Sequence, residues 1–176
     1  MDASSARVRP ATRADVPGIV SVSNSSTLPG EDFGFSGGMG SPFHDVSTLV
    51  AVWQDPNLVQ GEGVWVAEMG NRIVGCVTVE DRGCELELVN INVPLQLQGR
   101  GVGTLLVRSL EERAKAEGKR AVTLGTSRNA EGVAWKSLPW WQHLGYRITH
   151  EEENAWTRSI GPGVREVRMR KDLPAV

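Results

Sequence analysis

Three alternating glycines mark the segment of the chain whose residue types point most directly to chemistry. They precede a run with helical apolar spacing and are flanked by polar residues. Glycines leave backbone N–H groups exposed where a chain turns into a helix, and the first turn of a helix carries partial positive charge. The segment therefore predicts an anion site suited to a pyrophosphate, the alternative being an ordinary glycine-rich turn. It reads Gln98-Gly99-Arg100-Gly101-Val102-Gly103-Thr104.

Two common phosphate-binding patterns do not fit this segment. A Walker A loop needs GxxxxGK[ST], and no such string occurs in the chain. A dinucleotide fingerprint starting at Gly99 needs a sixth-position glycine, where the chain has Thr104. That fingerprint also needs an acidic residue about 20 positions further on, where the chain has Lys119 and Arg120. Both nucleotide interpretations are therefore weakened.

The sequence on either side of the glycine segment predicts a strand before it and a helix after it. Runs rich in β-forming residues at 64–69, 73–79 and 84–93 are joined by tight turns, which predicts antiparallel strands. In the third run, apolar residues occupy even positions up to Leu88 and odd positions from Val89, which predicts a β-bulge there. An apolar stripe from 102 to 114 predicts a helix. The strand after it, at 121–124, completes a right-handed crossover to a parallel pair.

The remaining segments complete a mixed pattern of strands and helices. We expect a strand at 7–10, a helix starting at 12–15, a helix at 129–143 disturbed by Pro139, and closing strands at 145–149 and 164–170. Between 23 and 42, glycines, serines and prolines predict a long loop, followed by a short helix at 45–54. The phenylalanines in or beside this loop predict that it packs on something, and they are Phe33, Phe35 and Phe43.

Length and composition limit the class of protein. The 176 residues are the length of one domain, and no apolar run approaches the about 20 residues that span a bilayer. Lys and Arg number 19 against 21 Asp and Glu, a net charge of −2, which argues against broad nucleic-acid binding. No cysteine or histidine spacing fits a zinc site. We expect Cys76 and Cys84 to be free thiols in a reducing cytoplasm, a redox pair being the alternative.

The string Gln98-x-x-Gly101-x-Gly103 after a bulged strand resembles the [Q/R]-x-x-G-x-[G/A] motif of the GNAT superfamily of acetyl-CoA-dependent N-acyltransferases. Segments 7–12, 141–146 and 168–173 are similar to that family's opening strand, its late Y-x-x-L-G-F segment and its closing strand. The resemblance covers roughly residues 6 to 173. It implies an α/β fold with a mixed, mostly antiparallel sheet of six to seven strands, a splayed parallel pair and about four helices, as one domain over 1–176.

The resemblance also implies that acetyl-CoA is the cosubstrate and that no metal takes part. The backbone of the glycine segment would bind the pyrophosphate, and the strand at Ile91 and Val93 would pair with the pantetheine arm. Asn129 matches a coenzyme-contacting asparagine of the family, although the stretch from it to Trp141 is a few residues longer than the family pattern. The implied coenzyme residues are Ile91, Val93, Gln98, Gly99, Arg100, Gly101, Val102, Gly103, Thr104 and Asn129.

For the chemistry, the resemblance implies direct attack of an amine on the acetyl carbonyl with help from a base. Glu87 matches a strand-borne glutamate that is the base in some members, and Glu85 on the same face is the second candidate. An exposed carboxylate pair and a water chain are the alternatives. The family's acidic tyrosine is replaced by Trp141, with Ser137 as a weak substitute. A thiolate leaving unprotonated is the other option, since a thiol has a pKa of about 8.5.

We therefore expect a cytoplasmic N-acetyltransferase that acetylates the primary amine of a small molecule, with its acceptor pocket built from the segment 23–43. The alternatives are another acyl donor, a macromolecular acceptor such as a protein N-terminus or aminoacyl-tRNA, and a non-catalytic acyl-CoA-binding module. We expect no membrane partner, and the acidic isoelectric point argues against nucleic acid. Whether the chain forms a homodimer stays open. A basic cluster at 165–171 fits a coenzyme phosphate, a nucleic acid or a solvated strand face.

Overall fold

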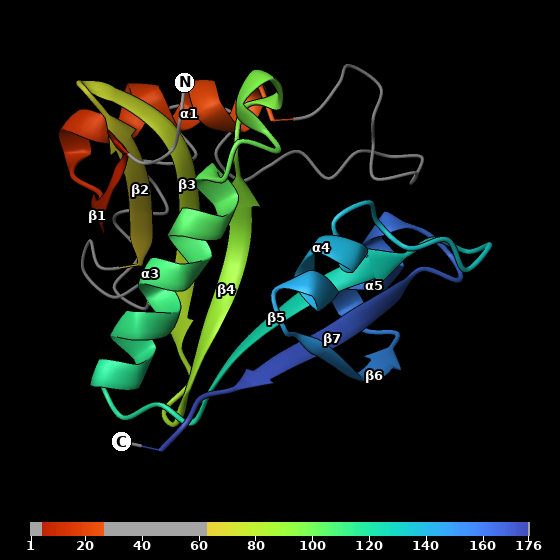
Figure 1. The fold of residues 1–176 in the computed structure, drawn as a ribbon. Coiled ribbons are helices and arrows are strands. Elements are labelled where there is room, and N and C mark those ends of the chain that lie inside the picture. The colour runs from red at the N-terminus through yellow and green to blue at the C-terminus, as the bar shows by residue number, and fades with distance from the viewer. Residues whose placement is uncertain (1–4, 27–62, 176) are drawn as a thin grey trace.

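A computed structural model describes residues 5–26 and 63–175 of the chain. Seven strands of these residues form one sheet in the order β1-β2-β3-β4-β5-β7-β6 (Figure 1). Only β4 and β5 run parallel among the neighbouring strands described. The strands are β1 (Arg7–Pro10), β2 (Val64–Met69), β3 (Arg72–Asp81), β4 (Glu85–Asn92), β5 (Ala121–Arg128), β6 (Arg147–Glu152) and β7 (Arg165–Asp172).

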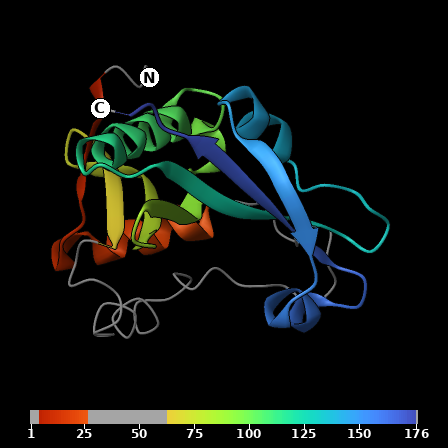
Figure 2. The same cartoon turned by 90° about the horizontal axis from the view of Figure 1, so that it is seen from below.

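Helices cover both faces of this sheet. Figure 2 shows α3 and α4 on one side and α1 and α5 on the other. Leu106 and Leu110 of α3 are fully buried against the sheet, and Ile19 of α1 is fully buried on the opposite face. The expected fold class is thus confirmed. The helices are α1 (Val16–Asn24), α3 (Val102–Ala116), α4 (Leu138–His143) and α5 (Ala155–Ile160), with 3-10 turns η2 (Arg13–Asp15) and η3 (Leu95–Leu97).

The parallel strands separate partway along their length. The pairing of β4 with β5 ends at Leu88 and Leu124, after which the two strands diverge (Figure 1). In the same region β4 gains one residue on β3 between Val89 and Asn92, and Asn90 has a φ of 51°. An extra residue bends a strand, and asparagine tolerates the left-handed conformation better than most residues. The expected bulge is therefore present, slightly later than its predicted place at 88–89.

The segment after β5 differs from its predicted helix at 129–143. Only the end is helical, because Asn129 starts a tight turn: its Oδ1 accepts the N–H groups of Glu131 at 3.1 Å and Val133 at 2.8 Å. Pro139 stands in the first turn of α4, where its missing N–H removes no helical hydrogen bond. The proline therefore helps to start the helix. The loop and helix predicted between 23 and 54 fall largely outside the described residues.

Candidate active site

The glycine segment forms the turn that enters α3. Gly99 and Gly101 have φ values of 73° and 92°, in the left-handed region that glycine adopts without strain. Gly101 is the N-cap of α3 and offers no side chain to cap it, and the first turn carries no acidic residue. The first-turn N–H groups have no backbone acceptor among the residues the structure describes. The turn therefore has the backbone conformation and the partial positive charge that an anion site needs.

Gln98 holds this turn in place through its side chain. Its Nε2 donates to the carbonyl of Val93 at 2.9 Å and to the carbonyl of Ser26 at 2.8 Å. The Ser26 hydroxyl in turn donates to Asn92 Oδ1 at 3.0 Å. These bonds join the end of α1, the bulged end of β4 and the glycine turn. The Gln98 side chain thus orients the turn, and its amide hydrogens already have protein acceptors.

Gly103 allows α3 and α4 to approach each other. A Cβ at this position would lie 3.2 Å from Cζ2 of Trp140 and 3.7 Å from Cγ2 of Val93. Trp140 also packs against Trp141, with ring centroids 4.4 Å apart. The third glycine of the motif therefore serves close packing, whereas Gly99 and Gly101 serve backbone conformation.

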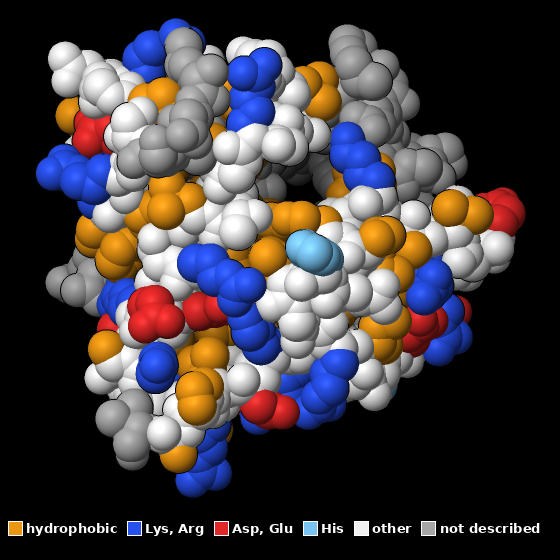
Figure 3. Space-filling view, viewed as in Figure 1, with side chains coloured by type: hydrophobic (Ala, Val, Ile, Leu, Met, Phe, Trp, Pro, Cys, Tyr) orange, Lys and Arg blue, Asp and Glu red, His pale blue; other side chains and the backbone are white. Residues whose placement is uncertain are grey.

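The gap between β4 and β5 opens next to the glycine turn. Ile91 and Val93 lie beyond Leu88, the last β4 residue paired with β5, and both are half-buried. Seen from the α3 side, the surface is hollowed between the α3 and α4 parts of the molecule, and hydrophobic side chains gather just below the hollow (Figure 3). An unpaired strand can receive an extended ligand as an added strand. The anion site and this unpaired stretch are therefore neighbours.

The side chains after β5 are poor candidates for a general acid. The single tyrosine of the chain, Tyr146, is 2% exposed and its hydroxyl donates to Glu111 Oε1 at 3.1 Å. Burial and the negative charge of Glu111 raise the pKa of Tyr146 well above its ordinary value. Trp141 is buried against the Tyr146 ring, with centroids 5.3 Å apart. Asn129 uses its amide oxygen in the local turn, and Ser137 is half-buried just before α4.

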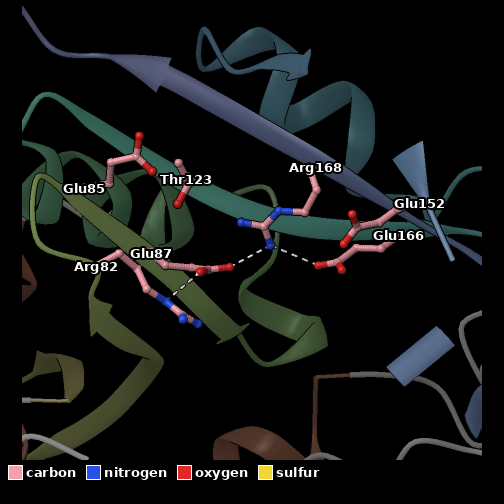
Figure 4. Close-up of a pocket in the computed structure, with 7 residues that line it drawn as sticks. All are labelled: Arg82, Glu85, Glu87, Thr123, Glu152, Glu166 and Arg168. Atoms are coloured by element: carbon pink, nitrogen blue, oxygen red, sulfur yellow. Dashed lines mark hydrogen bonds and ion pairs between the residues drawn. The ribbon is translucent and has the colours of Figure 1, made fainter. Parts of the chain in front are cut away.

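Glu85 and Glu87 face the side of the sheet opposite α3. They line a hollow of about 460 Å³ together with two further glutamates, two arginines and Thr123 (Figure 4). Glu87 is level with Thr123 in the parallel pair, one residue before that pairing ends. Glu87 therefore stands where β4 and β5 begin to separate. Glu85 is two residues further from the gap and is paired with Arg170.

Two arginines hold the carboxylate of Glu87. Its Oε1 accepts a hydrogen bond from Nη1 of Arg168 at 2.7 Å, and its Oε2 forms an ion pair with Nε of Arg82 at 3.1 Å. Nη1 of Arg168 also donates to Glu166 Oε1 at 3.0 Å. Burial lowers the pKa of Arg168, but its hydrogen bonds to the two glutamates outweigh this and raise the pKa above its ordinary value. Glu87 therefore faces a permanently charged partner.

Gly125 makes the contact between Arg168 and Glu87 geometrically feasible. A Cβ at 125 would clash with the carboxylate of Glu166 and lie 3.1 Å from Nη1 of Arg168. The strand prediction ended at 124 and took no account of this glycine. A glycine inside a strand marks close approach by another group, which was the available signal. Thr123 and Arg82 also line the hollow, and the sequence did not predict this because it depends on strand register.

The C-terminal basic cluster has carboxylate partners throughout. Besides Arg168 and Arg170, Lys171 binds Glu111 at 2.8 Å, and Arg165 lies 3.6 Å from Glu151. The cluster therefore behaves as a paired strand face. Across the residues described, no group of His, Cys, Asp and Glu is arranged to hold a metal ion. Both cysteines are free, as expected, with Cys76 buried and Cys84 exposed.

No helix in residues 5–26 or 63–175 is long and apolar enough to cross a membrane. Residues 35–146 match the family model described as acetyltransferase (GNAT) family. A probable N-acetyltransferase 14 of Xenopus tropicalis is 30% identical over 124 residues, covering 60% of this chain and 60% of that protein. N-acetyltransferase 8F1 of Rattus norvegicus is 36% identical over 118 residues, covering 63% of this chain and 51% of that protein. The match thus spans half to two thirds of these relatives.

Solved structures share the fold at low sequence identity. An aminoglycoside 6′-N-acetyltransferase complexed with coenzyme A superimposes with a TM-score of 0.69 at 18% identity, covering 97% of this chain and 99% of that chain. The ribosomal-protein-S18-alanine N-acetyltransferase of Escherichia coli gives a TM-score of 0.68 at 13% identity, covering 97% and 96%. At these identities the likeness establishes the arrangement of the chain and leaves the acceptor open.

Proposed function

The chain belongs to the acetyltransferase (GNAT) family, and we propose that it transfers the acetyl group of acetyl-CoA to the primary amine of a small molecule. One observation carries the proposal: the uncapped, glycine-lined first turn of α3 lies beside the unpaired end of β4. Coenzyme A would need both sites: its pyrophosphate needs the helix turn, and its extended pantetheine arm needs the unpaired strand beside that turn. We propose further that residues 1–176 act as one catalytic domain.

The coenzyme residues fit this role by backbone geometry. The N–H groups of Val102, Gly103 and Thr104 would donate to the pyrophosphate, with Arg100 adding positive charge beside them. The backbone at Ile91 and Val93 would pair with the pantetheine arm. Gln98 keeps the turn against β4. Because the Oδ1 of Asn129 accepts a hydrogen bond in the local turn, its Nδ2 would make the contact to the coenzyme.

The transfer proceeds by direct attack in this proposal. The amine nitrogen bonds to the acetyl carbon, the carbon–sulfur bond breaks, and coenzyme A leaves as its thiolate. Glu87 takes one proton of the ammonium before the attack, and the second proton of the nitrogen passes to solvent; the carboxylate has about four lone-pair positions, of which the Arg168 hydrogen bond uses one. Glu85 is the second candidate. Buried Tyr146 and Trp141 supply no proton, so the thiolate departs with solvent as its proton source.

Turnover of acetyl-CoA with a panel of amines, measured as free thiol release, tests this function. We expect thiol release that depends on both the amine and the protein. Calorimetry on the same protein measures acetyl-CoA binding separately. Binding with no turnover across small amines and peptide N-termini would instead favour the non-catalytic acyl-CoA-binding module.

A further inference from the structure

Thr123 places its side-chain hydroxyl at the hollow. The residue lies on β5 opposite Glu87, is only 8% exposed, and lines the hollow. None of the described residues hydrogen-bonds its hydroxyl, which points into the hollow in Figure 4. In the described part of the chain, the fully buried side-chain oxygens without a partner belong to Thr78 and Thr126, so the Thr123 oxygen is open to the hollow. A ligand atom in the hollow would supply the missing partner.

Arg168 offers a second donor to the same space. Only its Nη1 is engaged by Glu87 and Glu166, and Nη2 has no acceptor in the described part of the chain. Figure 4 shows this other terminal nitrogen on the side that faces Thr123. A guanidinium with one edge free binds a carboxylate through two oxygens. Nη2 and the Thr123 hydroxyl therefore form a place for a carboxylate.

A site for an ammonium group lies next to it. Glu87 Oε1 is 2.7 Å from Nη1 of Arg168, and the carboxylate retains free lone pairs. Positive and negative ligand groups would therefore bind side by side. An α-amino acid carries its ammonium and its carboxylate on a single carbon, which matches this adjacency.

Three of the four glutamates that line the hollow are paired with arginines, and the fourth, Glu152, lies 3.3 Å from His150 Nε2. Glu85 pairs with Arg170, Glu87 pairs with both Arg82 and Arg168, and Glu166 pairs with Arg168. A polyamine would need several carboxylates without cationic partners. A ligand with one positive and one negative group adds no net charge to this arrangement. The hollow is therefore better suited to a zwitterion.

Resting on the acetyl transfer proposed above, we propose that the acceptor is a free α-amino acid, with its ammonium at Glu87 and its carboxylate on Arg168 Nη2 and the Thr123 hydroxyl. Glu87 takes one proton from the α-ammonium, the free amine nitrogen bonds to the acetyl carbon, the carbon–sulfur bond breaks, the thiolate leaves, and the second proton of the nitrogen passes to solvent. The product is an N-acetyl amino acid. Thr123 and Arg168 are specificity-determining residues in this scheme.

The test compares amino acids with amines that lack only the carboxylate. Thiol release is measured for each common L-amino acid and for matched amines such as phenethylamine for phenylalanine, histamine for histidine and isopentylamine for leucine. For at least one pair we expect kcat/KM to be about 10–100-fold higher for the amino acid, the usual value of charged hydrogen bonds. Equal kcat/KM within every pair would overturn this inference and leave acetyl transfer standing.

Two variants and one control locate the effect. Thr123→Val should lower the ratio of amino acid to amine about tenfold by raising the KM of the amino acid. Arg168→Lys keeps a charge between the glutamates but loses the second terminal nitrogen, so the ratio should fall as well. Thr126→Val is the control, because Thr126 on the same strand has a buried hydroxyl without a partner but does not line the hollow. An equal effect of Thr126→Val and Thr123→Val would overturn the inference.

If acetyl-CoA binds but nothing turns over, the proposed catalysis fails, and direct titration decides the inference. Each amino acid is then titrated into coenzyme-loaded protein by calorimetry. Binding that is lost in Thr123→Val and kept in Thr126→Val supports the amino-acid site. Absence of binding for all of them overturns it.

Discussion

Glu87 is the residue on which the chemistry of this proposal depends, and Glu87→Gln tests it. Glutamine keeps the shape but cannot accept the proton, so kcat/KM should fall by about 10²–10⁴ near neutral pH. The loss should shrink as the pH rises toward the pKa of the acceptor amine, because free amine is then supplied by the solvent. A pH–rate profile of both proteins measures this.

Glu85→Gln is the matched control, since Glu85 lies on the same strand face but further from the gap. We expect a much smaller loss. An unchanged profile in Glu87→Gln with a collapse in Glu85→Gln would transfer the base to Glu85. No effect from either substitution would indicate a water relay and remove both from the mechanism.

At this scale the sequence predicted backbone conformation better than side-chain contacts. Gly99 and Gly101 could be predicted because their turn needs positive φ values, and glycine adopts these without strain. The Arg168 contact to Glu87 joins residues 81 positions apart, and it depends on the register of β4, β5 and β7 and on the missing side chain at Gly125. Nothing local in the sequence specifies such a contact.

Among the elements, the link between β1 and the first helical turns gives a pH-dependent test. Asp15 accepts Nη1 and Nη2 of Arg9 at 2.7 and 2.9 Å, and the N–H of Thr12 at 2.7 Å. The Arg9 hydrogen bonds hold the pKa of Asp15 at about 2, below its ordinary value of about 4. This pKa is depressed in the folded state, so its stabilisation is present above about pH 4 and is lost as the pH falls toward 2.

Asp15→Asn should therefore lower the free energy of unfolding by about 2 kcal/mol at neutral pH, and the difference should disappear near pH 2. Urea unfolding followed by circular dichroism measures it. Glu117→Gln is the control, because Glu117 forms a surface pair with Arg113 at 2.6 Å and should cost less than about 0.5 kcal/mol. A difference for Asp15→Asn that is independent of pH would show that the carboxylate charge is unimportant.

The bounds of elements with a strong local hydrophobic period were predicted closely, whereas those of short elements were not. β2 has the predicted bounds 64–69, because its β-rich run is closed by a Gly70-Asn71 turn. α4 begins nine residues later than predicted at Leu138, since the Asn129 side chain competes for backbone N–H groups that a helix would need. α5 spans six residues, too few for an apolar period, and is capped by Asn154, whose Oδ1 accepts the Thr157 N–H at 3.0 Å.

In the molecule as a whole, the two substrates would enter from different faces of the sheet. The anion site and the unpaired end of β4 lie beside α3 and α4, whereas the polar hollow lies on the opposite face (Figures 1 and 4). The two faces would meet where the pairing of β4 with β5 ends, at Leu88 and Leu124. In the proposed transfer, the splay of the parallel pair would let an acyl group on one face meet an amine from the other.

Acetyl-CoA binding by Gly101→Asp tests whether the glycine turn at the start of α3 binds the coenzyme. The substitution places a carboxylate and a Cβ where N–H groups would meet the pyrophosphate, so like-charge repulsion should abolish measurable binding in calorimetry. Gly118→Asp is the control, because Gly118 at the other end of α3 also has positive φ, 73°, and open space around it. We expect it to bind acetyl-CoA as the wild type does. Wild-type affinity in a folded Gly101→Asp protein would contradict the assignment of this turn as the coenzyme site.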